Sequence, residues 1–148
     1  MVSGLDPSAL RAAREKAGLT QHELARLVGA AGGERVSRWE LGTSEPRPDF
    51  LRRLAEVLKI PTGDFIHVEG AVPDLRALRL RAGLTATHLV ERTNLSTKTY
   101  LRWESGAWTR LPGRDVIDAL AGALGEPAEG VVDAFRESQR IRIARRRV

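Results

Sequence analysis

The sequence contains no cysteine, which excludes disulfide bonds and thiolate metal ligands. Aromatic residues make up 5% of the 148 residues and alternating β-branched patterns are almost absent, so we expect no strand beyond a short piece near Ile66 to Val68. No apolar run approaches the ~18 residues of a membrane span, and Met1 to Gly4 lack the regions of a signal peptide. We therefore expect a small all-α protein of the cytoplasm that binds no membrane.

Patterns for catalysis and metal binding are also lacking. The three histidines, His22, His67 and His88, show no ligand spacing to one another or to acidic residues. Neither a glycine-rich phosphate loop nor a nucleophile elbow is found. We therefore expect that the protein is not an enzyme and that it holds no metal and no cofactor.

Positive charge is in excess. The 24 lysines and arginines outnumber the 19 acidic residues, which gives a formal charge of +5 and a pI near 10.6. Nearly all of these cations are arginines, and the lysines are Lys16, Lys59 and Lys98. In a small helical chain this balance favours a polyanionic partner such as a nucleic acid.

The sequence contains an internal repeat. Residues 10–20, LRAAREKAGLT, return at 75–85 as LRALRLRAGLT. The other shared landmarks are a Trp-Glu pair and a later proline: Trp39-Glu40 with Pro46, and Trp103-Glu104 with Pro112. A repeat this long predicts two duplicated domains of four to five short helices each, rather than a thin solenoid. We place the first domain at 1–66, a linker at 67–72 and the second domain at 73–148.

Caps, prolines and glycines mark the helices of each copy. For the first copy they predict helices from Pro7 to Gly18, from Thr20 to Gly29, around Val36 and from Pro48 to Leu58, with a short piece near Pro61. For the second copy they predict Pro73 to Ala82, Ala86 to Thr93, Thr97 to Ser105, Arg114 to Leu124 and Pro127 to Ile143. At ~3.3 to 3.6 Å per residue the linker spans at most roughly 20 Å, so we expect the domains to stay close.

In the first copy, the second and third helices and their turn carry the main functional pattern. Thr20 and Glu23 form a capping box, and the apolar residues that follow repeat at helical spacing. In the third helix Val36 faces inward, and the residues predicted to face outward are Glu34, Arg35, Ser37 and Arg38. A helix that protrudes in this way fits the major groove of DNA.

At these residues the chain resembles the Cro and phage-repressor type of helix-turn-helix proteins, the XRE family, which has the lambda-repressor-like fold. The first copy has the residues of this pattern at Thr20, Gln21, Leu24, Ala25, Gly29, Val36, Ser37, Trp39, Glu40, Gly42 and Pro46. The resemblance implies that the outer side of the third helix reads bases, with Arg38 suited to guanine and Glu34 to cytosine. It adds Gly33, at the start of that helix, to the outward, base-facing positions. It also implies contacts with phosphate or the edge of the site by Gln21, Thr43, Ser44 and Arg47.

The second copy departs from the pattern, because Ala86 replaces the glutamine and Asn94 stands for the turn glycine. Its base-facing places are Thr97, Lys98, Leu101 and Arg102, and Leu101 is suited to a thymine methyl group. The phosphate contacts predicted in its longer loop are Trp108, Thr109, Arg110 and Arg114. The alternative for this copy is a domain kept for packing or dimerisation.

Three further features have a structural and a functional interpretation. We expect Trp39 and Trp103 to pack under the following loop rather than stack on bases, and Glu40 and Glu104 to be structural rather than catalytic. The arginine-rich end, Arg136 to Val148, either follows phosphates or enters a minor groove, or is solvated and partly disordered.

The sequence therefore predicts a bacterial-type transcription regulator that binds double-stranded DNA sequence-specifically, with one recognition helix of each domain in the major groove. If both helices lie on one face of the duplex, their subsites are ~34 Å apart. The alternative is a protein-interaction module, antitoxin-like or scaffolding, in which the second copy no longer binds DNA. Whether a homodimer or a partner protein is involved stays open at this stage.

Overall fold

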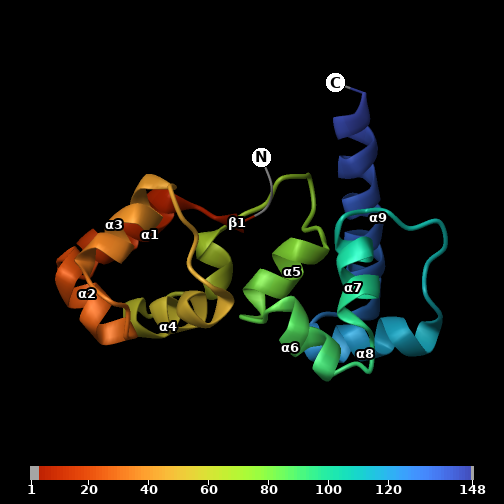
Figure 1. The fold of residues 1–148 in the computed structure, drawn as a ribbon, viewed down its shortest axis with the longest axis horizontal. Coiled ribbons are helices and arrows are strands. Elements are labelled where there is room, and N and C mark those ends of the chain that lie inside the picture. Colours follow the sequence, from red (N-terminus) through yellow and green to blue (C-terminus); the bar gives the residue numbers. More distant parts are fainter. Residues whose placement is uncertain (1–3, 148) are drawn as a thin grey trace. The chain divides into compact units, whose positions relative to one another are not determined.

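The computed structural model describes residues 4–147, and it is helical as predicted (Figure 1). Its chain divides into two compact units, Gly4–His67 and a second unit that starts at Val68. Within the described residues, none of the helices is long and apolar enough to cross a membrane.

The first unit consists of four helices and a small antiparallel strand pair. Its elements are β1 (Gly4–Leu5), α1 (Pro7–Lys16), α2 (Gln21–Val28), α3 (Gly33–Leu41), α4 (Pro48–Leu58), the 3-10 helix η1 (Thr62–Phe65) and β2 (Ile66–His67). Asp6 caps α1 by accepting hydrogen bonds from Ser8 N and Ala9 N, and Pro48 begins α4. The predicted strand piece is β2, and it pairs with β1, which the sequence did not indicate.

The core of the first unit lies between its four helices. The side chains that fill it are buried almost completely and come from every helix: Leu10, Leu24, Val36, Trp39, Leu51, Leu54 and Phe65. The pairing of β1 with β2 joins the two ends of the unit, with Leu5 opposite Ile66. The strand pair therefore links the start of the first unit to its last residues, Ile66 and His67.

The second unit repeats this order of helices and then extends it. Its helices are α5 (Leu75–Arg81), α6 (Ala86–Glu91), α7 (Thr97–Glu104), α8 (Arg114–Leu124) and α9 (Ala128–Arg146). The α6 helix ends two residues before the expected Thr93, and Asn94 takes the left-handed conformation, with φ of 56°, as its role in the turn required. The core is built around Leu75, Leu89, Tyr100, Leu120 and Phe135.

Of the two interpretations of the arginine-rich end, the disordered one does not fit the C-terminal helix α9. It continues past Ile143 to Arg146, and Glu137, Ser138 and Ile141 are buried in the second unit. Ser138 Oγ accepts a hydrogen bond from Leu75 N at 3.2 Å, which fastens α9 to the start of α5. The interpretation of a solvated, disordered end is therefore wrong for the described residues up to Ile141.

Candidate nucleic-acid interface

The turn between α2 and α3 brings the two helices into close contact. Gly29 ends α2 in the left-handed region with φ of 77°, where glycine is favoured. At Gly33, the first residue of α3, a Cβ atom would lie 3.2 Å from the backbone nitrogen of His22 and 3.3 Å from its Cα atom. Gly33 therefore faces α2, and the prediction that it faces outward was wrong. Its lack of a side chain allows the start of α3 to approach α2.

The other end of α3 is fixed by a buried ion pair. Arg14 of α1 donates from Nε to Glu40 Oε2 at 2.6 Å and from Nη2 to Glu40 Oε1 at 2.9 Å, and its Nη1 donates to Leu19 O at 2.8 Å. The side chains of Arg14 and Glu40 are only 11% and 3% exposed. The hydrogen bond to Glu40 raises the pKa of Arg14. Such a bidentate pair fixes orientation as well as distance, so α1 holds α3 at a defined angle.

Gln21 joins the same network at the start of α2. Its Nε2 donates to Glu40 Oε1 at 3.2 Å, so Glu40 connects α1, α2 and α3. This confirms the structural interpretation of Glu40. Trp39 is also structural, because it is buried and its ring lies 5.5 Å from the ring of Phe50 in α4.

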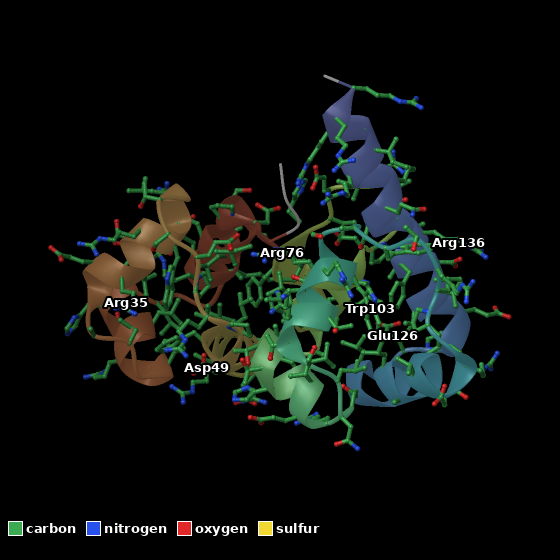
Figure 2. All side chains as sticks on the ribbon, turned by 45° about the vertical axis from the view of Figure 1, so that its right-hand side comes forward. Arg35, Asp49, Arg76, Trp103, Glu126 and Arg136 are labelled. Carbon is green, nitrogen blue, oxygen red and sulfur yellow. The ribbon has the colours of Figure 1, made fainter. Side chains whose placement is uncertain are left out.

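The outer face of α3 carries the residues predicted to read bases. Glu34, Arg35 and Arg38 are exposed and Ser37 is half-buried, while Val36 points into the core (Arg35 is labelled in Figure 2). Arg38 Nη2 lies 3.9 Å from Glu34 Oε2, and both side chains are well exposed. An ion pair this long and this solvated is weak, so the guanidinium of Arg38 is available for another partner.

The loop after α3 folds back onto the end of that helix. Gly42 is left-handed, and Thr43 donates to the carbonyl oxygen of Arg38 from its nitrogen at 3.1 Å and from Oγ1 at 3.3 Å. Ser44 N donates to the same oxygen at 3.4 Å. These bonds hold Thr43 and Ser44 beside the exposed end of α3, and the exposed Arg47 precedes α4.

The second unit repeats the buried ion pair. Arg79 donates to Glu104 from Nε at 2.9 Å and from Nη2 at 2.8 Å, and from Nη1 to Leu84 O at 3.0 Å. Burial lowers the pKa of Arg79, but its hydrogen bond to Glu104 and the charge of that carboxylate outweigh burial, so the pKa is raised. Tyr100 is fully buried, and burial raises the pKa of its hydroxyl.

The arginines of these two pairs were not among the residues predicted to matter. Arg14 and Arg79 occupy the same place in the repeated segment, as do Leu19 and Leu84, and their partner glutamates also recur. The internal repeat therefore indicated that each arginine and glutamate recur together. The spacing of about 25 residues between arginine and glutamate, however, gave no local pattern that would pair them.

The α7 helix presents an outer face like that of α3. Ser96 caps it by accepting from Thr99 N at 3.1 Å. Lys98, Leu101 and Arg102 are exposed and Thr97 is half-buried. Trp103 packs on Phe135 of α9 with ring centroids 5.4 Å apart, so it is structural as predicted.

The loop after α7 is anchored on α9 rather than left free. Trp108 Nε1 donates to Phe135 O at 3.0 Å, and Gln139 Nε2 donates to Trp108 O at 2.8 Å. Because the indole has a single donor, Trp108 does not serve as the phosphate contact we expected, and that prediction was wrong. Thr109 and Arg110 are exposed, and the loop that contains them bows outward between α7 and α8 (Figure 1).

Arg114 lies beyond this loop, in the first turn of α8. Its Nε donates to Asp118 at 3.0 Å, and both side chains are exposed. The prediction that Arg114 contacts phosphate therefore concerns the start of α8, not the end of α7.

Two units, each with a short helix whose inner side is fixed by a buried arginine–glutamate pair and whose outer side is exposed, define a tandem helix-turn-helix protein. Comparison with family models agrees: residues 10–65 match a model described as helix-turn-helix, and residues 74–134 match one described as helix-turn-helix domain. The chain thus carries two helix-turn-helix domains in tandem, and it is a DNA-binding regulator of transcription.

One curated relative is the HTH-type transcriptional repressor RghR of Bacillus subtilis (strain 168). The two sequences are 29% identical over 110 residues, which cover 73% of this chain and 80% of the relative. No solved structure matches the chain significantly. Because the match covers most of both chains, the similarity extends beyond one helix-turn-helix unit.

Proposed function

We propose that the protein binds duplex DNA sequence-specifically through both units, with α3 and α7 in the major groove, and that it represses transcription. The observation that carries the proposal is the combination of exposed outer faces on both helices with the same buried ion pair behind each. The name of the Bacillus subtilis relative, a transcriptional repressor, supports the sign of regulation.

In the first unit, Arg38 is proposed to make the main base contact. Its guanidinium is exposed, and a bidentate contact to guanine is worth ~1 to 3 kcal/mol of discrimination. Glu34 can accept from cytosine, Ser37 can bond a base or a phosphate, and Arg35 lies beside them. These side chains share one face of α3.

Backbone contacts are assigned to residues at the ends of α2 and α3. The amide of Gln21 uses one N–H on Glu40, so its second N–H is available for a phosphate oxygen. Thr43, Ser44 and Arg47 are proposed to bind the phosphates beyond α3. Contacts of this kind set register and supply no sequence information.

The second unit is proposed to read different bases. Lys98 and Arg102 suit guanine, and Leu101 suits a thymine methyl group. The hydroxyl of Thr97 can form a hydrogen bond with a donor or an acceptor on a base edge. Further phosphate contacts are assigned to Thr109, Arg110 and Arg114. Because these side chains differ from those of α3, we propose an asymmetric binding site.

The remaining assignments follow from this function. We propose domains at 1–66 and 73–148 with a linker at 67–72, and the division between the compact units falls within that linker. We also propose that the protein acts in the cytoplasm, associated with the nucleoid, without catalytic activity.

Two recognition helices in one chain make a homodimer or partner protein unnecessary for a bipartite site.

The test is selection from random duplexes by mobility shift, followed by sequencing. Wild type should enrich a motif with two different parts. Arg38→Ala should relax one part only, and Lys98→Ala with Arg102→Ala should relax the other, whereas Arg47→Ala should weaken all sequences alike. A single-part motif that the α7 variants leave unchanged would restrict DNA reading to the first unit.

A further inference from the structure

The second unit contains a hollow that the helix-turn-helix residues do not account for. It has a volume of about 480 Å³ and lies between α5, α7 and α9. One stripe of α9 lines it, with residues at helical spacing: Ser138, Ile141, Arg142, Arg145 and Arg146. Leu101 of α7 and Arg76 of α5 border it from the other helices.

Four arginines and three acidic residues line the hollow, so the excess of positive charge is a single unit; the acidic residues are Glu69, Asp74 and Glu104. Arg145 Nη2 donates to Glu69 Oε2 at 2.6 Å, and Arg76 Nη1 lies 3.8 Å from Glu104. Within residues 4–147, neither Arg142 nor Arg146 forms an ion pair. From 138 to 147 the chain has five arginines and no acidic residue. Two guanidinium groups are therefore left to bind an anion from outside the unit.

The position of Leu101 connects this hollow to the DNA-binding side of the unit. Leu101 is 46% exposed on the proposed base-facing side of α7, and it also borders the hollow. The arginines of α9 consequently flank the face that α7 offers to the major groove. The phosphates beside a groove are the nearest anions to a helix that occupies it.

Several contacts hold α9 in this position. Gly106, which follows α7, has φ of 82°, and a Cβ atom there would collide with the carbonyl oxygen of Ser138. The bonds from Trp108 to Phe135 and from Leu75 to Ser138 fix α9 at two more points. The arginines are thus presented on a rigid helix rather than on a flexible end. The first unit ends at β2 and has no such helix.

We propose that this hollow is a phosphate-binding site that takes the DNA backbone beside the groove read by α7, with Arg142 and Arg146 as its main ligands. The inference rests on the proposed DNA binding by the second unit. A row of arginines along one helix suits a linear polyanion, because successive side chains can meet successive phosphates.

The first test measures the dependence of DNA affinity on salt. The variant Arg142→Gln/Arg146→Gln should bind the selected duplex roughly 3- to 30-fold more weakly, as expected for two solvated charge contacts. Its slope of log K against log salt should be shallower by about 2, because each phosphate contact contributes ~0.9. Sequence preference should not change.

The matched control is Arg81→Gln/Arg136→Gln, which removes the same charge from exposed residues of the same unit outside the hollow. Figure 2 shows Arg136 on the side of α9 opposite Arg76. If wild type fails to bind duplex DNA, the proposed function fails. If wild type binds and both double variants change the slope equally, only the present inference is overturned. If the double variant does not fold, Arg146→Gln alone replaces it, because Arg146 is exposed. This single variant is expected to change the salt slope by half as much.

The second test locates α9 on the DNA. The chain has no cysteine, so Ala144→Cys gives a single thiol for a tethered iron chelate while every arginine is kept. Cleavage of the bound duplex by this variant, and not by Glu129→Cys at the other end of α9, is expected. Absence of cleavage from Ala144→Cys would contradict the proposal.

A third measurement separates the DNA backbone from a small phosphate ligand. Wild type is titrated calorimetrically with inorganic phosphate at constant ionic strength. We expect no submillimolar binding. Submillimolar binding that is lost in Arg142→Gln/Arg146→Gln, together with an unchanged DNA slope, would assign the hollow to a small ligand and overturn the proposal.

Discussion

Removal of the Glu40 carboxylate should destabilise the first unit far more than removal of an exposed carboxylate that also pairs with an arginine. In Glu40→Ala the guanidinium of Arg14, 11% exposed, keeps Leu19 O but loses two hydrogen bonds and its counter-charge. Breaking a buried pair on one side costs ~3–5 kcal/mol. A unit of this size has on the order of 3–10 kcal/mol of stability in total, so the variant should lose most of it.

The matched control is Glu15→Ala. Arg11 Nε binds Glu15 at 2.9 Å in α1, with the same chemistry, but the two side chains are 65% and 55% exposed. An exposed pair is worth about 0.3–0.5 kcal/mol. The contrast between Glu40 and Glu15 therefore compares a buried network that joins three helices with an exposed pair inside one helix.

The assay is urea unfolding followed through the fluorescence of Trp39, in a Trp103→Phe/Trp108→Phe background that leaves no tryptophan in the second unit. With a slope of about 1 kcal/mol/M, Glu40→Ala should lower the midpoint by ~3 M or more. Glu40→Gln, which keeps one acceptor oxygen, should fall between wild type and Glu40→Ala and provides a folded variant. Equal shifts for Glu40→Ala and Glu15→Ala would refute the reasoning.

Three other predictions concern recognition, backbone geometry and pH. Arg38→Ala should cost ~1 to 3 kcal/mol of discrimination at one base pair, read from competition mobility shifts. Gly106→Ala should lower the melting temperature much more than Gly125→Ala, because both have positive φ but only Gly106 abuts α9. Hydrogen bonds from Arg140 lower the pKa of Glu137 below 4.5, so its stabilisation is complete above pH 4.5 and is lost as pH falls further. Glu137→Gln should weaken this part of the acid transition, as followed by circular dichroism.

The helices could be predicted because their ends are determined locally. The capping box of Thr20 and Glu23, the left-handed Gly29 and the proline that begins α4 each act within a few residues, and the structure contains all three. The duplication then allowed the regular first copy to guide the assignment of the second, where Asn94 replaces a glycine. The helix-turn-helix class follows from this local information.

Long-range contacts could not be predicted in the same way. Gly33 is indistinguishable in sequence from an outward residue of α3, and only the approach of α2 shows that it faces inward. Trp108 lies in a loop whose partner, Phe135, is 27 residues away. The α9 end has the composition of a solvated segment, yet Phe135 and Ile141 supply enough apolar surface to pack it.

The two copies share the buried arginine–glutamate pair and differ in the side chains on their outer faces. This difference bears on the kind of DNA site that the protein should bind. Each recognition helix is held by an arginine and a glutamate with nearly the same geometry, so the two are presented in equivalent ways within their units. The outer faces, however, carry Glu34 and Arg38 in one case and Lys98 and Leu101 in the other. Under the proposed reading of bases by both helices, these unlike side chains should select two unlike half-sites, so a perfect palindrome should be bound more weakly than the asymmetric sequence.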